Sequence, residues 1–197
     1  MKIAWADAHV VVVDKPFGLA SHPGPTVTDD VVTRLKRTYP YVGLHHRLDL
    51  PTSGLLLFAI DPAANPSLAS AFSGRRVQRT YKAVLVGRAT GGVWDRPIDG
   101  QTAVTHVKVH GQQNGLSAVH LKLETGRTHQ IRIHAALAGT PVAGDRRHGG
   151  DAGRRWPRLA LHAARLRFPH PITGEEVAVE SEIPDDLVPL WHQALGN

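Results

Sequence analysis

The residues most able to do chemistry lie in a charged cluster around one aspartate, Asp49. A turn and then an apolar run follow this cluster, so a buried strand would hold the Asp49 carboxylate at the end of a rigid element. An aspartate at such a place is also a common turn cap that accepts hydrogen bonds from the backbone N–H of Thr52 or Ser53. Taken alone, the stretch favours the cap. It reads His45-His46-Arg47-Leu48-Asp49-Leu50-Pro51-Thr52-Ser53-Gly54-Leu55-Leu56-Leu57.

A second cluster, residues 124–134, supplies two arginines after a flexible glycine. The first N–H groups and the positive end of a helix beginning there would suit a phosphate, and a solvated helix face is the equally strong alternative. Together the two clusters offer one carboxylate and one cation that does not titrate. An arginine beside an aspartate lowers the pKa of the carboxyl group and keeps it ionised when buried. The second cluster reads Glu124-Thr125-Gly126-Arg127-Thr128-His129-Gln130-Ile131-Arg132-Ile133-His134.

Metal and cofactor chemistry find little support in the residue pattern. His129 and His134 are five residues apart, off one helical face, and no His-Glu-x-x-His motif occurs among the 13 histidines. The absence of cysteine excludes thiolate metal sites and cysteine nucleophiles. No glycine-rich nucleotide loop is present, so we expect no metal and no cofactor. A glycosidase would need a second carboxylate facing Asp49, for which Glu124 or Asp145 would have to serve, and this stays a weaker alternative.

The charge balance points to a polyanionic partner. The chain has 197 residues, with 23 Lys and Arg against 17 Asp and Glu, which gives a net charge of +6. Such an excess favours RNA or DNA, and a noncatalytic RNA-binding protein would share it. Residues 1–20 contain three charged side chains after Lys2 and no long apolar stretch, so we expect no signal peptide, no membrane span and a cytoplasmic protein. We also expect a monomer.

The elements that must position these residues are mostly strands joined by short turns. Alternating or continuous apolar runs predict strands over 9–13, 55–60, 80–86, 103–110, 116–123, 159–168 and 176–179. Four-residue spacing and helix-start signals predict helices over 29–39, 61–74, 127–137 and 185–195. Residues 113–115, Gln-Asn-Gly, predict a β-hairpin between two of these strands. We therefore expect a mixed α+β domain on a mainly antiparallel sheet, formed by residues 1–197 as one unit.

Several motifs in order along the chain resemble those of the RluA family of pseudouridine synthases. The most specific one is the first cluster, His46-Arg47-Leu48-Asp49 followed by Thr52-Ser53-Gly54-Leu55. The similarity extends over nearly the whole chain. It includes Asp14-Lys15-Pro16-x-Gly18-Leu19 with His22-Pro23, Tyr81-Lys82-Ala83, Gly126-Arg127-Thr128-His129-Gln130-Ile131-Arg132, Gly144-Asp145, Leu161-His162-Ala163 and His170-Pro171-x-Thr173-Gly174-Glu175.

This resemblance implies isomerisation of uridine to pseudouridine in structured ribosomal or transfer RNA, on a bisected antiparallel sheet with flanking helices. It implies that Asp49 is the catalytic aspartate, that Tyr81 stacks on the target base and that Arg132 pairs with the aspartate. Arg47 would fill the place that the extruded base leaves in the RNA stack. Whether the aspartate attacks the uracil, attacks the sugar or promotes elimination stays open. We further expect RNA contacts from four other side chains and a bare catalytic domain without a separate N-terminal RNA-binding domain. The four are His46, Arg127, His129 and Lys15.

Overall fold

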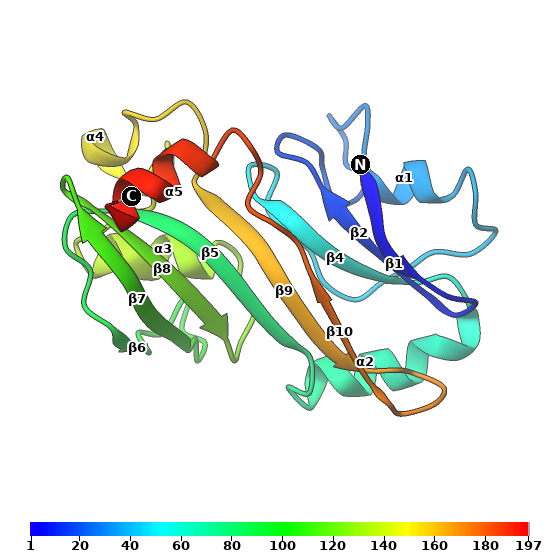
Figure 1. Cartoon of the computed structure of the whole chain (residues 1–197). Helices are drawn as coiled ribbons and strands as arrows, with labels where there is room; N and C mark the ends of the chain where they lie inside the picture. Colours follow the sequence, from blue (N-terminus) through cyan, green and yellow to red (C-terminus); the bar gives the residue numbers. More distant parts are fainter. Residues whose placement is uncertain (197) are drawn as a thin grey trace. The chain divides into compact units, whose positions relative to one another are not determined.

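The computed structural model describes residues 1–196 and divides the chain into two compact units (Figure 1). Unit 1 contains residues 1–79 and 163–181, and unit 2 contains residues 80–162 with the C-terminal segment from Glu182. The chain therefore passes from one unit to the other three times. The prediction that residues 1–197 form a single catalytic domain is not tested by this division and stays a prediction.

Unit 1 is a sheet with three short helical segments. Its strands follow the order β1-β2-β4-β9, with β3 beside β4 and β10 beside β9. The pairs β1–β2, β2–β4, β3–β4 and β9–β10 are antiparallel. The elements are β1 (Lys2–Ala6), β2 (Val10–Lys15), α1 (Val31–Leu35), β3 (Gly43–Leu44), β4 (Ser53–Ala59), η1 (Pro62–Ala64), α2 (Asn65–Ser73), β9 (Leu161–Pro169) and β10 (Glu176–Glu180).

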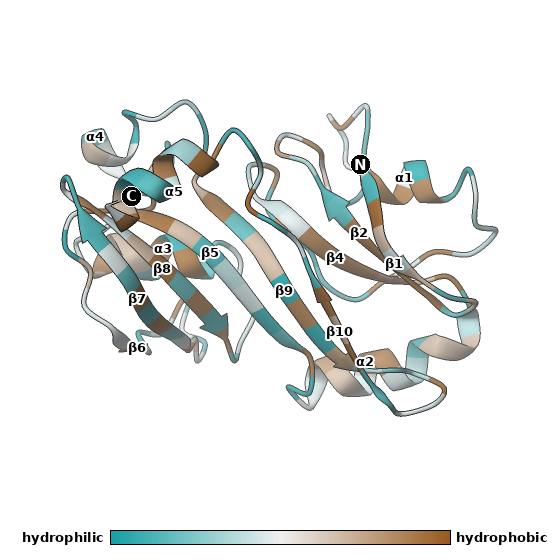
Figure 2. Cartoon of the chain, in the orientation of Figure 1, coloured by the Kyte–Doolittle hydropathy of each residue, from teal (hydrophilic) through white to brown (hydrophobic). Residues whose placement is uncertain are grey.

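The core of unit 1 forms around β2 and β4, which are buried on both faces. Residues 10–13 are four consecutive valines with no exposed surface, and every residue of β4 is buried. Valine suits a pleated strand because its branched side chain packs well against its neighbours. Leu68 and Ala71 of α2 join the same cluster. Figure 2 shows the hydrophobic colouring along β4. This core carries the loop that contains Asp49, which leads into the start of β4.

Unit 2 contains the strand order β5-β8-β7-β6 and three helices. The β-hairpin predicted at residues 113–115 is present between β7 and β8. It turns at Asn114 and Gly115, whose φ angles of 55° and 71° are those of a type I′ turn. The elements are β5 (Gln78–Val86), β6 (Gly92–Trp94), β7 (Thr105–Gln113), β8 (Leu116–Leu123), α3 (Gln130–Leu137), α4 (Gly150–Gly153) and α5 (Val188–Leu195).

Helices α3 and α5 lie on opposite faces of the unit 2 sheet (Figure 1). Thr105 of β7 hydrogen-bonds His134 of α3, which places α3 on the face of Thr105. Gly111 of β7 meets α5 so closely that a Cβ there would lie 2.8 Å from the Cα of Leu195. Lys108 and His120 are cross-strand partners on the face opposite Thr105. His120 stacks on Trp191 of α5, so α5 packs on this second face of the sheet.

The predicted α+β fold class is confirmed. The structure combines helices with β-sheet, and the described strand pairs are mainly antiparallel. All seven predicted strands are present. The predicted helix 29–39 shortens to α1, which begins after Asp30, whose side chain accepts from the Thr33 N–H. The predicted helix 127–137 begins only at Gln130, because His129 takes a left-handed conformation with φ of 56°. The strands β1, β3 and β6 and the helix α4 were not predicted, since they are short or largely exposed and so carry no clear periodicity.

Candidate active site

The loop that carries Asp49 is held on both sides of the aspartate. The Ser21 hydroxyl donates to the Leu48 carbonyl oxygen at 2.7 Å and accepts from the Leu48 N–H at 3.1 Å. The Leu50 carbonyl oxygen accepts from the Gly18 N–H at 3.1 Å. The turn closes through main-chain atoms, because the Thr52 N–H donates to the Asp49 carbonyl oxygen at 2.9 Å. The backbone on each side of Asp49 is therefore fixed, and the side chain is half-buried.

Lys15 does not fit the RNA contact that the sequence suggested. Its side chain has no exposed surface, and its ammonium donates to the carbonyl oxygens of Leu19 at 2.8 Å, Pro16 at 3.1 Å and Leu50 at 3.3 Å. A buried ammonium with these acceptors is not placed to meet a phosphate. The bond to Leu50 instead fastens the Asp49 loop to the end of β2. We therefore assign Lys15 a positioning role in place of RNA binding.

The His46 ring is also held by contacts within unit 1. Its Nε2 accepts from the Leu57 N–H of β4 at 3.0 Å, and its ring packs on Phe72 with centroids 4.9 Å apart. Burial, with the nearby Arg79 and His45 side chains, lowers the pKa of His46 to about 3. The imidazole is thus neutral at neutral pH and adds no positive charge for RNA. This geometry favours a structural contact between the loop and β4 over the predicted RNA contact.

Arg47 is exposed, as a residue that enters an RNA stack would need to be. Its Nη1 lies 3.0 Å from His22 Nε2, and His22 Nδ1 lies 2.7 Å from the Pro23 carbonyl oxygen. A guanidinium only donates and a carbonyl only accepts, so the two contacts fit the His22 tautomer that carries its hydrogen on Nδ1. The histidine thereby supports the Arg47 side chain from one side.

Gly54 explains why the Thr-Ser-Gly part of the motif needs a glycine. Its φ of +113° is a conformation that residues with a side chain rarely adopt, and a Cβ there would lie 2.3 Å from the Ala163 carbonyl oxygen. The backbone of β4 therefore approaches β9 more closely than any side chain would permit. This close approach sets where the loop leaves the sheet.

In unit 2, Gln130 joins the start of α3 to the sheet through four hydrogen bonds. Its amide nitrogen donates to the Val104 carbonyl oxygen at 2.9 Å and to the Thr105 hydroxyl oxygen at 3.0 Å. Its amide oxygen accepts from the Thr125 hydroxyl at 2.7 Å and from the Arg127 N–H at 3.0 Å. All four hydrogen-bonding positions of this buried amide are used. The glutamine thus fixes the helix that presents Arg132.

Arg132 forms a buried ion pair with Asp145, a partner that no local pattern in the sequence indicates. Arg132 Nε donates to Oδ2 at 2.9 Å and Nη2 donates to Oδ1 at 2.8 Å, and the two side chains are 6% and 0% exposed. Oδ1 also accepts from the N–H groups of Arg147 and His148, each at 3.0 Å. Burial alone would raise the pKa of Asp145, but the Arg132 and backbone hydrogen bonds outweigh it and the net pKa is lowered. The carboxylate therefore stays ionised and aligns the guanidinium.

The glycine-rich segment 149–155 contains α4 and is joined to Asp145. The Gly149 N–H donates to the Asp145 carbonyl oxygen at 3.0 Å, and the Gly153 carbonyl oxygen accepts from the Gly144 N–H at 2.6 Å. A Cβ at Gly149 would lie 2.5 Å from that same Asp145 oxygen. The glycines therefore permit the close turn that surrounds the buried carboxylate.

The remaining predicted residues of unit 2 lie around α3 and β5. Arg127 is partly exposed, and its Nε donates to the Thr102 carbonyl oxygen at 3.0 Å. His129 Nδ1 lies 2.9 Å from His148 Nε2. Tyr81 is 5% exposed, on β5. The predicted RNA contacts of Arg127 and His129 and the predicted base-stacking role of Tyr81 stay predictions.

The candidate residues divide between the two units. Unit 1 holds Asp49 and Arg47, and unit 2 holds Tyr81 and Arg132. The predicted pairing of Asp49 with Arg132 stays a prediction. The sequence marks Asp145 as part of a Gly-Asp motif but does not connect it with Arg132. The spacing of 13 residues carries no local signal for that pairing.

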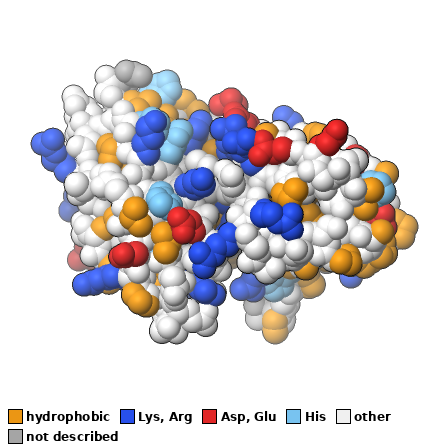
Figure 3. Space-filling model, turned by 90° about the horizontal axis from the view of Figure 1, so that it is seen from below, with side chains coloured by type: hydrophobic (Ala, Val, Ile, Leu, Met, Phe, Trp, Pro, Cys, Tyr) orange, Lys and Arg blue, Asp and Glu red, His pale blue; other side chains and the backbone are white. Residues whose placement is uncertain are grey.

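Within residues 1–196, no group of three or more histidine, aspartate or glutamate side chains is arranged to hold a metal ion. No helix in this described part of the chain is long and apolar enough to cross a membrane. Lys and Arg side chains are abundant on the face shown in Figure 3.

Comparison with known proteins provides the context for this geometry. The sequence profile described as RNA pseudouridylate synthase matches residues 9–137, which include Asp49, Tyr81 and Arg132. A relative named ribosomal large subunit pseudouridine synthase D, from Vibrio parahaemolyticus, is 36% identical over 225 residues. That match covers 96% of this chain and 69% of the relative.

Two human structures share the fold. The structure of human RNA pseudouridylate synthase domain containing 1 is 30% identical, with a TM-score of 0.75 over 96% of this chain and 85% of that chain. The structure of human RNA pseudouridylate synthase domain containing 4 has a TM-score of 0.78 over 99% of this chain and 92% of that chain. At 23% identity, the second match speaks for the fold alone.

Proposed function

Since the chain belongs to the RNA pseudouridylate synthase family and is an isomerase, we propose that it converts uridine to pseudouridine in ribosomal large-subunit RNA, with Asp49 as its catalytic carboxylate. The substrate proposal rests on the names of the relatives that match nearly the whole chain. The assignment of Asp49 rests on its motif and on its place within the matched residues 9–137.

The reaction rearranges one nucleotide without a net change in its atoms. The bond from C1′ to N1 breaks, the uracil turns, and a bond from C1′ to C5 forms. C5 loses its proton and N1 gains one, so there is no net oxidation, reduction or hydrolysis. One well-placed carboxylate is sufficient in principle to assist the change at the sugar or at the base. The target base must leave the RNA stack to reach it.

The observation that carries this proposal is the fixed loop of the Asp49 motif. A catalytic group must be held within a fraction of an ångström of its working position. Ser21 and Lys15 bind the carbonyl oxygens of the residues on either side of Asp49. The backbone on both sides of Asp49 thus has the support expected around a reacting carboxylate. In the turn-cap alternative the Asp49 side chain would serve only to close the turn, which the main-chain bond from Thr52 to Asp49 already closes.

The other proposed roles follow from the chemistry of each side chain. We assign Tyr81 to stacking on the extruded base and Arg132 to keeping the active-site carboxylate ionised. Arg47 is assigned to the RNA stack, because it is exposed and its planar guanidinium stacks well on bases. Asp145 and Gln130 are positioning residues, since they act by holding Arg132 and α3.

The test uses RNA transcribed with uridine tritiated at C5, because pseudouridine formation releases that tritium to water. The substrates are large-subunit ribosomal RNA and, separately, transfer RNA. Asp49→Asn should release no tritium while binding RNA nearly as well as the native protein, since most affinity comes from phosphate contacts. The matched control is Asp29→Asn, which removes an exposed carboxylate of unit 1 paired with Arg34.

Each outcome decides part of the proposal. Tritium release by native protein and by Asp29→Asn from ribosomal RNA, with none from Asp49→Asn, is expected. Normal release by Asp49→Asn would remove Asp49 from the chemistry. Release from transfer RNA alone would overturn the substrate class. Binding without release from either RNA by the native protein would favour the noncatalytic RNA-binding alternative.

A further inference from the structure

The α5 face of the unit 2 sheet carries a strip of basic side chains that the proposed reaction does not use. Strands β5, β7 and β8 contain no aspartate or glutamate along their lengths. Helix α5 contains none either. The basic face, as we define it, consists of Lys82, Lys108, Lys122, His110 and His120 with Trp191 of α5.

Direct contacts join the members of the basic face. The rings of His110 and His120 lie with centroids 3.9 Å apart. His120 stacks on Trp191 at 5.9 Å with an angle of 18° between the planes, and Lys82 Nζ lies 6.0 Å from the centre of the Trp191 ring. Lys108 is directly opposite His120 in the β7–β8 register. Lys122 is two residues along β8 from His120, so it lies on the same face.

The two histidines are affected both by burial and by the neighbouring cations, and the acidic side chain next to β8, Glu124, contacts His106. Burial, with the charges of Lys108 and Lys82, lowers the pKa of His110. Burial, with His110, Lys82 and Lys108, lowers the pKa of His120 to about 4. Neighbouring cations thus disfavour protonation of both rings. An anion bound here would relieve this repulsion.

The basic face lies opposite the face that holds the proposed catalytic residues of unit 2. Tyr81 and Lys82 are consecutive on β5, so their side chains point to opposite faces of the sheet. Helix α3, which carries Arg132, packs on the other face through Thr105. An RNA segment at the basic face is therefore a different segment from one that stacks on Tyr81.

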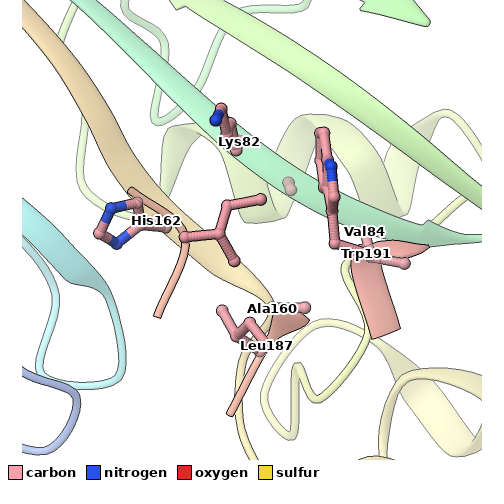
Figure 4. Close-up of a pocket in the computed structure, with 8 residues that line it drawn as sticks. Lys82, Val84, Ala160, His162, Leu187 and Trp191 are labelled. Atoms are coloured by element: carbon pink, nitrogen blue, oxygen red, sulfur yellow. The ribbon is translucent and has the colours of Figure 1, made fainter. Parts of the chain in front are cut away.

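A small apolar hollow of about 10 Å³ lies beside Lys82, between β5 and α5. Figure 4 shows Lys82 and Trp191 side by side at this hollow, with Val84, Ala160 and Leu187 among the residues that line it. A flexible ammonium beside an aromatic ring and an apolar wall suits a nucleotide chain, in which a charged phosphate alternates with a flat base.

We propose that the basic face binds the phosphodiester backbone of a second RNA segment, outside the segment that carries the target uridine. The proposal rests on the proposed function in that it takes RNA as the partner. RNA is favoured over an acidic protein because one of the cations, Lys82, lies against the ring of Trp191 at the edge of a small apolar hollow, and nucleic acid offers both phosphates and flat bases to such a pair. Lysine ammonium groups meet phosphates as point charges and release counterions on binding.

The test measures binding in the Asp49→Asn background, so that it does not depend on turnover. Lys108→Gln with Lys122→Gln removes two cations of the basic face and spares Lys82, the neighbour of Tyr81. The matched control is Lys2→Gln with Lys36→Gln, two exposed lysines of unit 1. The RNAs are a short stem-loop with one target uridine and a long large-subunit fragment that contains the same stem-loop.

For the long fragment, the plot of log affinity against log salt concentration has a negative slope. The double substitution should make this slope shallower by about two, one for each phosphate that the variant no longer neutralises. The stem-loop should keep its slope, and its single-turnover rate should be unchanged by the same substitutions in protein with Asp49 intact. Three results would overturn the proposal. They are a slope that becomes equally shallow for both RNAs, an equal change in the control variant, and an unchanged slope for the long fragment. Binding of polyglutamate to the basic face with no change in the RNA slope would assign the face to an acidic protein. Failure of turnover alone would affect only the proposed function.

Discussion

Replacing Asp145 by asparagine tests whether this carboxylate aligns Arg132. The variant keeps an oxygen that can accept from the Arg147 and His148 N–H groups, but it faces Arg132 Nε with an amide donor and removes the compensating charge. Breaking a buried ion pair by removing one partner costs about 3–5 kcal/mol, and here both side chains are almost fully buried. Total stabilities are about 5–15 kcal/mol, so Asp145→Asn should be visibly destabilised yet foldable.

The assay is urea unfolding at pH 7 and at lower pH, with single-turnover rates measured under conditions where the variant is folded. The matched control is Glu180→Gln, which removes an exposed partner of Arg165 and should cost about 0–1 kcal/mol. The native pKa of Asp145 is lowered, so its contribution to stability is present above the unfolded pKa of about 4 and is lost as pH falls through the folded value. The difference in stability between native protein and Asp145→Asn should therefore shrink below about pH 4.

Misalignment of Arg132 should also slow the folded Asp145→Asn variant by about 100-fold, the decrease typical of a displacement of about 1 Å in a catalytic site. RNA affinity should be largely retained, because Asp145 is buried and meets no solvent. A folded variant with native rates, or a stability difference from the native protein that does not depend on pH down to about 3, would refute the alignment role.

Two further substitutions test the loop of Asp49. Lys15→Met keeps the apolar stem but leaves the Leu50 and Leu19 carbonyl oxygens without their ammonium donor. Activity should therefore fall, while the salt dependence of RNA binding stays the same. If the slope of log affinity against log salt became shallower by about one, Lys15 would be a phosphate contact after all. His46→Gln retains an oxygen that can accept from the Leu57 N–H but does not titrate. Because the folded pKa of His46 is about 3, the native protein should lose stability as pH falls from about 6.5 toward 3, and urea unfolding should show that part of the decrease missing from His46→Gln. An identical pH dependence in the two proteins would contradict this account of His46.

Local patterns determined most of the strands and the order of the motifs. The valine run of β2, the apolar run of β4 and the Asn-Gly turn between β7 and β8 each express their structure within a few neighbouring residues. The motif around Asp49 is likewise local, and it was sufficient to suggest the family that the sequence profile supports. The short strands β1 and β6 escaped prediction because their exposed side chains leave no apolar period.

Tertiary structure alone decided which charged side chains face solvent and which are buried. Lys15 and Arg47 look equally suited to RNA in the sequence, yet packing buries the first among carbonyl oxygens and leaves the second exposed. The partner of Arg132 within unit 2 is set by how the loop after α3 folds back, which no periodicity encodes. The basic face likewise forms only when β5, β8 and β7 lie side by side beneath α5. Burial and ion pairing depend on contacts between distant segments, so they appear only once the chain has folded.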